Sequence, residues 1–169
     1  MVRFMVIAAP RSGTAWCANW LSDGTYLALH DPLWDHHYRD LDKIAGPKTG
    51  VCCTGLGYVP EWVNQHPAPK VILHRAPNEV NNSLETLGLP TCPQKLFDNL
   101  WKIDGLHVHW TNLFGPDAEL VHRHLKIGDF DPVRWSMLRD MEVTAKWQNR
   151  RRHQNLQLRD QFIAEGLFG

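Results

Sequence analysis

Residues 3–16, Arg-Phe-Met-Val-Ile-Ala-Ala-Pro-Arg-Ser-Gly-Thr-Ala-Trp, constrain the fold of this chain more than any other stretch. The apolar run over residues 4–9 predicts a short buried strand, because it is too short for a core helix and a proline closes it. A Ser-Gly-Thr turn follows, and residues 15–21 predict the first turns of a helix. A strand, a tight turn and a helix start gather backbone N–H groups around an anion, so this segment predicts a phosphate-binding turn.

The composition of the turn points to a particular kind of phosphate loop. Gly13 lets the backbone come close to a phosphate, and Arg11 and Thr14 add a charge and a hydroxyl. The ATPase P-loop has a lysine between its last glycine and the Ser or Thr, whereas Thr14 follows Gly13 directly here. The segment closely resembles the 5′-phosphosulfate loop of sulfotransferases, which use 3′-phosphoadenosine 5′-phosphosulfate (PAPS) as donor. The resemblance implies donor contacts from seven residues: Pro10, Arg11, Ser12, Gly13, Thr14, Ala15 and Trp16.

A second strand, turn and helix start lies at residues 70–84. Arg75 ends the strand, Pro77 fits the first helical turn, and Ser83 lies about two turns into the helix. Arg75 and Ser83 can face one crevice at the carboxyl end of a parallel sheet. This pair resembles the sulfotransferase motif that holds the 3′-phosphate of PAPS, although Ala76 stands where the family usually has aspartate.

A third segment, residues 26–33, predicts a strand that ends at Asp31 before a proline. In sulfotransferases that act on carbohydrates or protein tyrosine, a glutamate at the similar position is the general base. The resemblance therefore implies that Asp31 accepts the proton of the attacking hydroxyl. Asp31 as a simple turn cap is the alternative, because Asp-Pro caps turns well. His30, His36 and His37 are the other candidates for the base, since a histidine serves in the cytosolic branch of the family.

These resemblances together imply in-line transfer of a sulfuryl group from PAPS to an acceptor hydroxyl or amine. Arg11 and the N–H groups of the loop would stabilise the charge that develops on the leaving phosphate. Arg75 and Ser83 would hold the 3′-phosphate, and Trp16 would stack near the adenine. Ala15 replaces the second threonine of the family's usual Ser-Gly-Thr-Thr and removes one hydroxyl from the 5′-phosphate. The mechanism needs no metal.

The remaining elements predict the same architecture throughout the chain. Residues 50–55 predict a third strand and residues 119–130 a last strand, while further helices are expected over residues 59–65, 93–103, 132–141 and 154–164. Residues 126–130 have a weak similarity to the family signature after its last core strand, with Gly128 in place of glutamate. Repeated βα units predict an α/β fold of three layers, a mostly parallel sheet flanked by helices, of the P-loop nucleotide-binding type. We expect residues 1–169 to form a single domain.

Composition limits the partners. The chain has 18 basic and 18 acidic side chains, so no overall charge favours nucleic acid. No stretch approaches the roughly twenty apolar residues of a membrane span, and the start of the chain is too short in apolar residues for a signal peptide. Four cysteines without a C-x-x-C pair favour reduced thiols and a cytoplasmic protein. The expected partner is a small-molecule or carbohydrate acceptor, and the sequence defines no oligomeric state.

Other polar groups admit more than one interpretation. His107 with His109, and His122 with His124, would each form a pair on one face of a strand, but packed or surface histidines are favoured over a metal site. Residues 150–152, three arginines, begin the last expected helix as a solvated start or as a donor contact. Two alternative functions remain: a P-loop kinase of a nucleotide or small metabolite, and a member of the fold that binds a nucleotide without catalysis.

Overall fold

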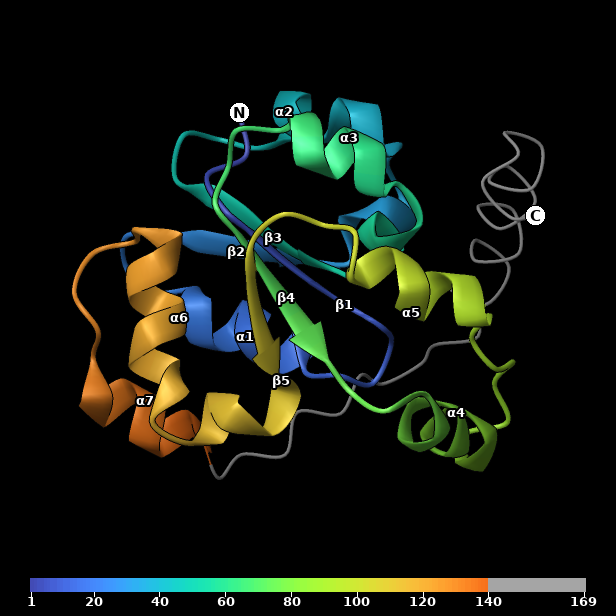
Figure 1. The fold of residues 1–169 in the computed structure, drawn as a ribbon. Coiled ribbons are helices and arrows are strands. Elements are labelled where there is room, and N and C mark those ends of the chain that lie inside the picture. The colour runs from blue at the N-terminus through green and yellow to red at the C-terminus, as the bar shows by residue number, and fades with distance from the viewer. Residues whose placement is uncertain (140–169) are drawn as a thin grey trace.

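The structure, a computed structural model, describes residues 1–139, so the helix expected at 154–164 and the three arginines at 150–152 lie outside the described part. Five parallel strands form one sheet in the order β2-β3-β1-β4-β5 (Figure 1). The strands are β1 (Met5–Ala8), β2 (Leu27–His30), β3 (Thr49–Cys53), β4 (Lys70–His74) and β5 (Leu106–His109). The predicted parallel sheet flanked by helices is confirmed.

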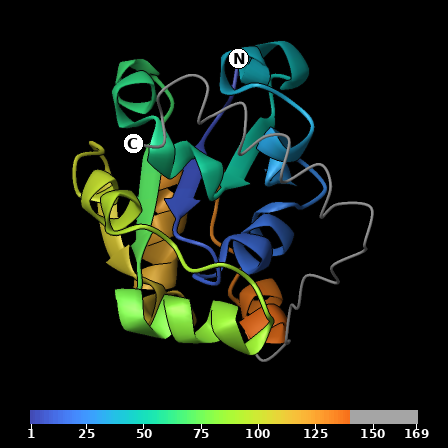
Figure 2. The same cartoon turned by 90° about the vertical axis from the view of Figure 1, so that its right-hand side faces the viewer.

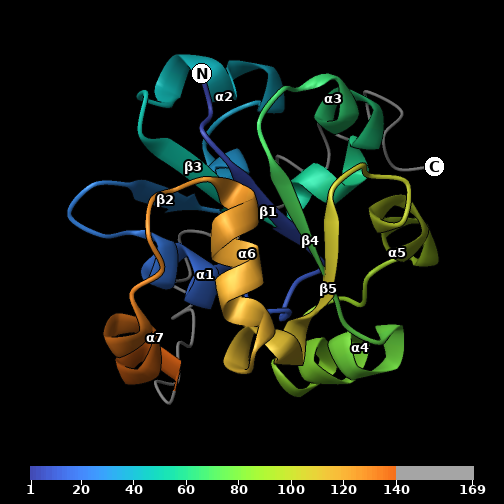
Figure 3. The ribbon, with the colours of Figure 1, turned by 60° about the vertical axis from the view of Figure 1, so that its left-hand side comes forward.

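Helices cover both faces of this sheet and make three layers (Figures 1 and 3). One face carries α1 (Thr14–Leu21) and α6 (Asp117–Leu125), and the opposite face carries α2 (Leu41–Ile44), α3 (Pro60–Gln65) and α5 (Gln94–Leu100). Beyond the tips of β4 and β5 lies α4 (Pro77–Thr86), and α7 (Pro132–Arg139) packs beside α1 (Figure 2). Within residues 1–139 the connections also contain four 3₁₀ turns: η1 (Pro32–Trp34), η2 (Tyr38–Asp40), η3 (Gly55–Tyr58) and η4 (Trp110–Phe114).

The core divides into two hydrophobic clusters because successive strand residues point to opposite faces of the sheet. In β1, Met5 and Ile7 join the cluster under α2, α3 and α5, while Val6 and Ala8 join the cluster under α1 and α6. In β3, the adjacent Cys53 and Cys52 separate in the same way. Strands buried on both faces explain the continuous apolar runs in the sequence.

The prediction of a last strand over residues 119–130 is wrong. Residues 117–125 form α6 instead, and the fifth strand, β5, lies earlier in the chain. The buried positions of α6 are Ala118, Val121, His122 and Leu125, which recur with the helical spacing of three and four residues. Lys126 takes a left-handed conformation (φ 54°) and ends the helix, so the chain does not continue as a strand there.

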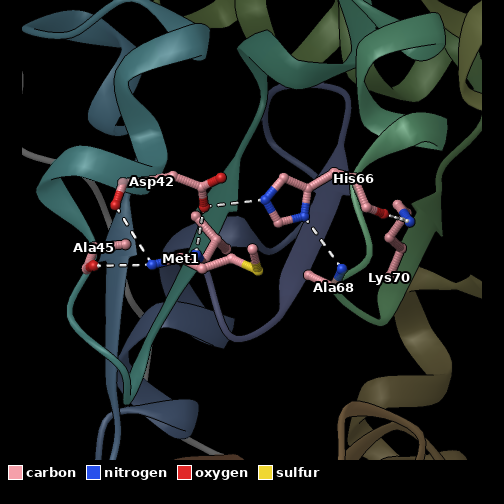
Figure 4. Close-up of polar contacts among 7 residues, drawn as sticks. Met1, Asp42, Ala45, His66, Ala68 and Lys70 are labelled. Carbon is pink, nitrogen blue, oxygen red and sulfur yellow. Dashed lines mark hydrogen bonds and ion pairs between the residues drawn. The ribbon is translucent and has the colours of Figure 1, made fainter.

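A polar cluster closes the amino edge of the sheet (Figure 4). The His66 imidazole lies 3.1 Å through Nε2 from Asp42 Oδ1, and its Nδ1 accepts the N–H of Ala68 at 3.1 Å. Lys70 Nζ donates to the His66 carbonyl at 2.6 Å, and the N–H of Val2 donates to Asp42 Oδ1 at 2.7 Å. Since Nδ1 accepts, Nε2 carries the proton and donates to the carboxylate. These bonds join the start of β1 and β4 to α2.

In the part of the chain from residue 1 to residue 139, no helix is both long enough and apolar enough to cross a membrane.

Candidate functional site

The topology places a crevice at the carboxyl edge of the sheet, between the ends of β1 and β4. β1 and β4 are neighbours, with Ala8 opposite Leu73. The chain leaves β1 toward β2 on one side of the sheet and leaves β4 toward β5 on the other side. In open α/β sheets, ligands bind where the connections diverge in this way. The loop over residues 9–13 and the segment from Arg75 into α4 flank this point.

The two predicted phosphate motifs touch each other at this crevice. Arg75 Nη1 donates to the Arg11 carbonyl oxygen at 2.6 Å, although the residues are 64 positions apart. Arg11 Nε donates to Ser83 Oγ at 3.2 Å. The structure therefore brings Arg11, Arg75 and Ser83 together. The Arg11 side chain is directed toward the residue expected at the 3′-phosphate, rather than toward the start of α1.

The loop after β1 has the backbone conformation of a tight turn. Arg11 (φ 62°) and Gly13 (φ 94°) are both left-handed, and the Cys17 N–H makes the first helical bond to the Gly13 carbonyl at 2.9 Å. An added Cβ at Gly13 would meet only Leu113 at 3.6 Å and Leu73 at 4.0 Å, so the positive φ, not a lack of space, requires glycine here.

The first turn of α1 has backbone N–H groups that are available to bind a ligand. Among the described residues no side chain caps α1, and the first N–H groups of a helix have no acceptor within the helix. Pro10 and Ala15 are half-buried, whereas Ser12 and Thr14 are buried. The loop can therefore offer backbone N–H groups and the positive end of the helix dipole to an anion.

A groove of about 420 Å³ lies between α4 and the turn after β5. Its lining consists of Arg75, polar residues of α4, the last residue of β5 and the two residues after it: Glu79, Asn82, Ser83, Thr86, His109, Trp110 and Thr111. Both residues predicted for the 3′-phosphate, Arg75 and Ser83, thus line a single groove. The groove is open, and apart from Trp110 the side chains that line it are polar or charged, which suits a ligand that carries charge and hydroxyl groups.

Arg75 is held in place from three sides. Its Nε donates to Glu79 Oε2 at 3.1 Å, its Nη1 donates to the Arg11 carbonyl, and its guanidinium carbon lies 4.6 Å from the ring centroid of Trp110. The side chain is 20% exposed, and Nη2 makes no hydrogen bond within the described residues. A guanidinium fixed in this way has N–H groups left to donate to a planar or tetrahedral anion.

Asp31 lies in a second polar cluster, at the ends of β2 and β3. Its Oδ1 accepts the N–H of Thr54 at 2.7 Å and the Thr54 hydroxyl at 3.1 Å. Its Oδ2 lies 3.3 Å from His30 Nε2, which also lies 3.3 Å from Thr14 Oγ1. The Asp31 side chain is 11% exposed and that of His30 is 32% exposed. Both carboxylate oxygens thus have partners, and His30 is the more accessible of the two.

Trp16 does not lie where the expected stacking on adenine requires it. The residue is 5% exposed, and its ring packs against Trp20 (5.1 Å between centroids) and Phe114 (4.9 Å). Its Nε1 donates to the Leu138 carbonyl at 2.9 Å. Trp16 is therefore a core residue in the layer of α1. The spacing of Trp16 and Trp20, four residues apart in a helix, was the signal that could have placed both on the buried face.

The other candidate histidines are dispersed. His36 is exposed, and His37 Nδ1 accepts the N–H of Arg39 at 3.2 Å in η2. His122 and His124 lie on α6, so the condition for their pairing on a strand fails. Within residues 1–139 no three metal-binding side chains are grouped so as to hold an ion.

The sequence did not predict a stack of three aromatic rings near the ends of β4 and β5, formed by His74, Trp101 and His107. His74 Nε2 and His107 Nδ1 are 2.7 Å apart, and His107 Nε2 bonds to the Ile103 carbonyl at 2.9 Å. Trp101, which is 67% exposed, stacks on His74 with 3.8 Å between ring centroids. Because a carbonyl can only accept, His107 carries its proton on Nε2, and His74 must donate from its own Nε2. Burial, followed by the charges of His107 and His109, lowers the pKa of His74 to about 4.

Comparisons of the chain with models of known protein families, with curated protein sequences and with solved structures found no match. The chemistry of the site therefore follows from its geometry alone. Two arginines, a serine hydroxyl and the N–H groups of a tight loop converge on one crevice, and a carboxylate with a neighbouring imidazole lies beside the same loop. This arrangement can bind an anion with more than one charged group and can accept a proton next to it.

Proposed function

We propose that the protein is a PAPS-dependent sulfotransferase, with a nucleotide site of the P-loop type in its α/β fold. The observation that carries the proposal is the direct contact of the two motifs: Arg75 bonds to the carbonyl of Arg11, and Arg11 bonds to Ser83. Each motif alone resembles a sulfotransferase sequence. Because the two motifs touch, they would form one site for a donor that is phosphorylated at both the 5′ and 3′ positions. No other grouping of charges is needed for donor recognition.

The donor would supply the activated sulfuryl group, and the chain would bind and orient it. The loop N–H groups and the uncapped start of α1 would bind the 5′-phosphosulfate, because they offer donors and a positive dipole end. Arg75 and Ser83 line the groove in which the 3′-phosphate would lie. Arg11 stands between the two and would share its charge with both phosphate groups. Its contact with Ser83 supports a larger role at the 3′ side than the sequence implied.

Proton transfer would involve His30 and Asp31 together. Asp31 Oδ1 is bound by two donors of Thr54, while Oδ2 faces His30 Nε2. With both of its oxygens engaged in this way, the carboxylate would serve to position the imidazole ring. The more exposed His30 would then take the proton of the acceptor hydroxyl on Nδ1, while its Nε2–H stays on Asp31 Oδ2 and holds the ring. Thr14 Oγ1, also 3.3 Å from Nε2, ties this pair to the donor loop.

The acceptor in this proposal is a small molecule or a carbohydrate, and the protein would act in the cytoplasm. The groove beside α4 is open, and β2, β4 and β5 each end in a histidine at the carboxyl edge, namely His30, His74 and His109. Such a surface suits an acceptor with several hydroxyl groups.

The test is a calorimetric titration with 3′-phosphoadenosine 5′-phosphate, AMP, and ATP with magnesium. We expect the 3′-phosphorylated nucleotide to bind at least about tenfold more tightly than AMP, because it adds charge-assisted bonds to Arg75. Arg75→Ala should remove this preference. Arg123→Ala is the matched control, because Arg123 forms an exposed ion pair on α6 and does not line the groove. Tighter binding of ATP with magnesium, or no binding of any nucleotide, would overturn the proposal.

Catalysis is tested by sulfuryl transfer from labelled PAPS to a panel of hydroxyl compounds. His30→Gln should lower kcat by at least about a hundredfold if the imidazole is the general base. Asp31→Asn should lower kcat less, and should change the dependence of kcat on pH, because it removes the group that orients His30. An unaltered kcat in both variants would exclude this pair as the base.

A further inference from the structure

We propose that Glu79 sets the selectivity of the groove, by competing with the 3′-phosphate of a bound nucleotide for Arg75. The inference rests on the proposed function, because it assumes that the ligand of this groove carries that phosphate. It assigns a role to a residue for which the sequence motifs gave none. It also predicts that the present chain binds the 3′-phosphorylated nucleotide less tightly than the groove otherwise allows.

The geometry places Glu79 on the group that the phosphate needs. Glu79 Oε2 lies 3.1 Å from Arg75 Nε, and both side chains line the groove. Glu79 is in the first turn of α4, and Ser83 follows one turn later on the same face of the helix. A phosphate bound to Arg75 and Ser83 therefore lies within a few ångströms of the Glu79 carboxylate. The Glu79 side chain is 50% exposed, so it is free to move away when a ligand arrives.

Charge decides the sign of the effect. A phosphate monoester carries close to two negative charges at neutral pH and must displace or approach a carboxylate in order to reach Arg75. Repulsion between a dianion and a single charge at about 5 Å in a solvent-exposed site corresponds to about five- to tenfold in affinity. A 3′-hydroxyl suffers no such repulsion and can donate to the carboxylate. Glu79 therefore lowers the affinity for the 3′-phosphorylated nucleotide and leaves the affinity for AMP unchanged or slightly higher.

The competition would act on the spent donor as well as on the donor. The 3′,5′-bisphosphate that remains after transfer keeps the phosphate that Glu79 opposes. A carboxylate that returns to Arg75 as the nucleotide leaves would shorten the time for which this product is bound, and product release often limits kcat. Glu79 also favours the start of α4 through the helix dipole, which gives it a structural reason to be present. The experiment must separate these two roles.

Three variants separate competition from a merely structural role. Glu79→Gln removes the charge and keeps an oxygen that can accept from Arg75 Nε, Glu79→Ala removes both, and Glu79→Asp keeps the charge on a shorter side chain. The matched control is Glu85→Gln, which changes the net charge of α4 equally at a residue outside the groove. The probes are 3′-phosphoadenosine 5′-phosphate and AMP, titrated by calorimetry at one fixed salt concentration, with dissociation followed by stopped-flow tryptophan fluorescence.

We expect Glu79→Gln and Glu79→Ala to tighten binding of the 3′-phosphorylated nucleotide about five- to tenfold, to slow its dissociation by a similar factor, and to leave AMP within twofold. Glu79→Asp and Glu85→Gln should stay close to the original chain. An unchanged or weaker affinity in Glu79→Gln overturns the inference, and a loss in Glu79→Ala alone would identify Glu79 as a residue that only positions Arg75.

These outcomes are distinguishable from failure of the proposed function. If the original chain prefers the 3′-phosphorylated nucleotide through Arg75 but Glu79→Gln has no effect, only the role of Glu79 is wrong. If neither the original chain nor any Glu79 variant prefers that nucleotide over AMP, both the proposed function and this inference are wrong. If the preference emerges only in Glu79→Gln and disappears again in the double variant with Arg75→Ala, both are supported.

Discussion

The polar clusters at the two edges of the sheet differ in how fully their own side chains satisfy one another. At the amino edge, His66 has a 4% exposed side chain, and both of its ring nitrogens are bonded within the protein. At the carboxyl edge, Arg75 keeps N–H groups that have no partner among residues 1–139, and its neighbour Glu79 is half exposed. A closed cluster adds to stability, whereas an open one keeps bonds in reserve for a ligand.

Backbone strain shows the same asymmetry. The described residues include three non-glycine positions with positive φ, namely Arg11, Asp31 and Lys126, and the first two lie at the carboxyl edge. Such conformations cost free energy and persist where the surrounding structure holds them. The third, Lys126, ends α6 near the amino edge, where its carbonyl accepts from Arg3 Nη2 at 3.0 Å, but it is not part of the His66 cluster. The difference implies that substitutions at the two edges will separate into effects on stability and effects on binding.

The largest expected loss of stability follows from His66→Ala. The substitution leaves the N–H of Ala68 and the carboxylate of Asp42 without their partner and opens a cavity, so we expect the free energy of unfolding to fall by about 3 kcal/mol. Burial raises the pKa of Asp42, but bonds from Val2 and His66 outweigh it and hold that pKa below its usual value. Urea unfolding at pH 7 measures the change. A loss below about 1 kcal/mol would show that the closed cluster is not a stabilising one.

Gly13→Ala tests whether the loop at the carboxyl edge is strained as well as open. Because φ is 94°, an alanine should cost about 1–2 kcal/mol of stability and should weaken nucleotide binding as the loop N–H groups shift. Gly24→Ala is the control, since an added Cβ there meets nothing within 4 Å. Urea unfolding and calorimetry together measure both effects. Equal behaviour of the two variants would remove the argument from backbone conformation.

Stability should decrease as the pH falls from 6.5 to about 4. The pKa of His74 in the folded chain is about 4 because of burial and the neighbouring His107 and His109, whereas a histidine in the unfolded chain titrates near 6.5. The unfolded state therefore binds more protons in this window, and protonation favours unfolding. Burial lowers the pKa of His122 in the same direction. The urea midpoint measured at several pH values should fall less steeply in His74→Phe, and an unchanged slope would contradict this assignment.

The smallest effect is expected from Glu119→Gln on α6. Glu119 pairs with Arg123 at 3.4 Å, with the same spacing as the pair of Glu79 with Arg75, but both side chains are well exposed. Such pairs contribute about 0.5 kcal/mol or less. Unfolding and nucleotide titration should both stay within experimental error of the original chain, and a measurable change in nucleotide affinity would show that the groove responds to remote charge.

The fold was largely predictable because each central strand can be recognised from its own short run of residues. The strands at the centre of a parallel sheet are buried on both faces, so β1, β3 and β4 are continuous apolar runs. The edge strand β5 has only one buried residue, Val108, between two histidines, and this left no apolar pattern to recognise. The prediction for α6 failed although its buried residues, Ala118, Val121, His122 and Leu125, have helical spacing, because that spacing was not weighed against a strand.

The candidate site was predictable in its parts but not in its assembly. Arg75 and Ser83 could be assigned to one crevice because strand, turn and helix spacing is local. The contact of Arg11 with Ser83 depends on β1 and β4 being neighbours, which no local pattern contains. The bonds of Thr54 to Asp31 likewise need the pairing of β2 with β3. The ion pair of Arg75 with Glu79 could have been predicted from the sequence, because residues four apart at a helix start contact each other.

Cys52 and Cys53 point to opposite faces of β3, so the reactivity of each thiol can report the unfolding of a different layer of helices. Both thiols are buried, and burial raises the pKa of each, so neither reacts with an alkylating reagent until its layer of helices opens. Cys52 reports the layer of α1 and α6, and Cys53 reports the layer of α2, α3 and α5. Mass spectrometry after pulsed alkylation therefore reads, at two adjacent residues, whether the two layers leave the sheet together or one after the other.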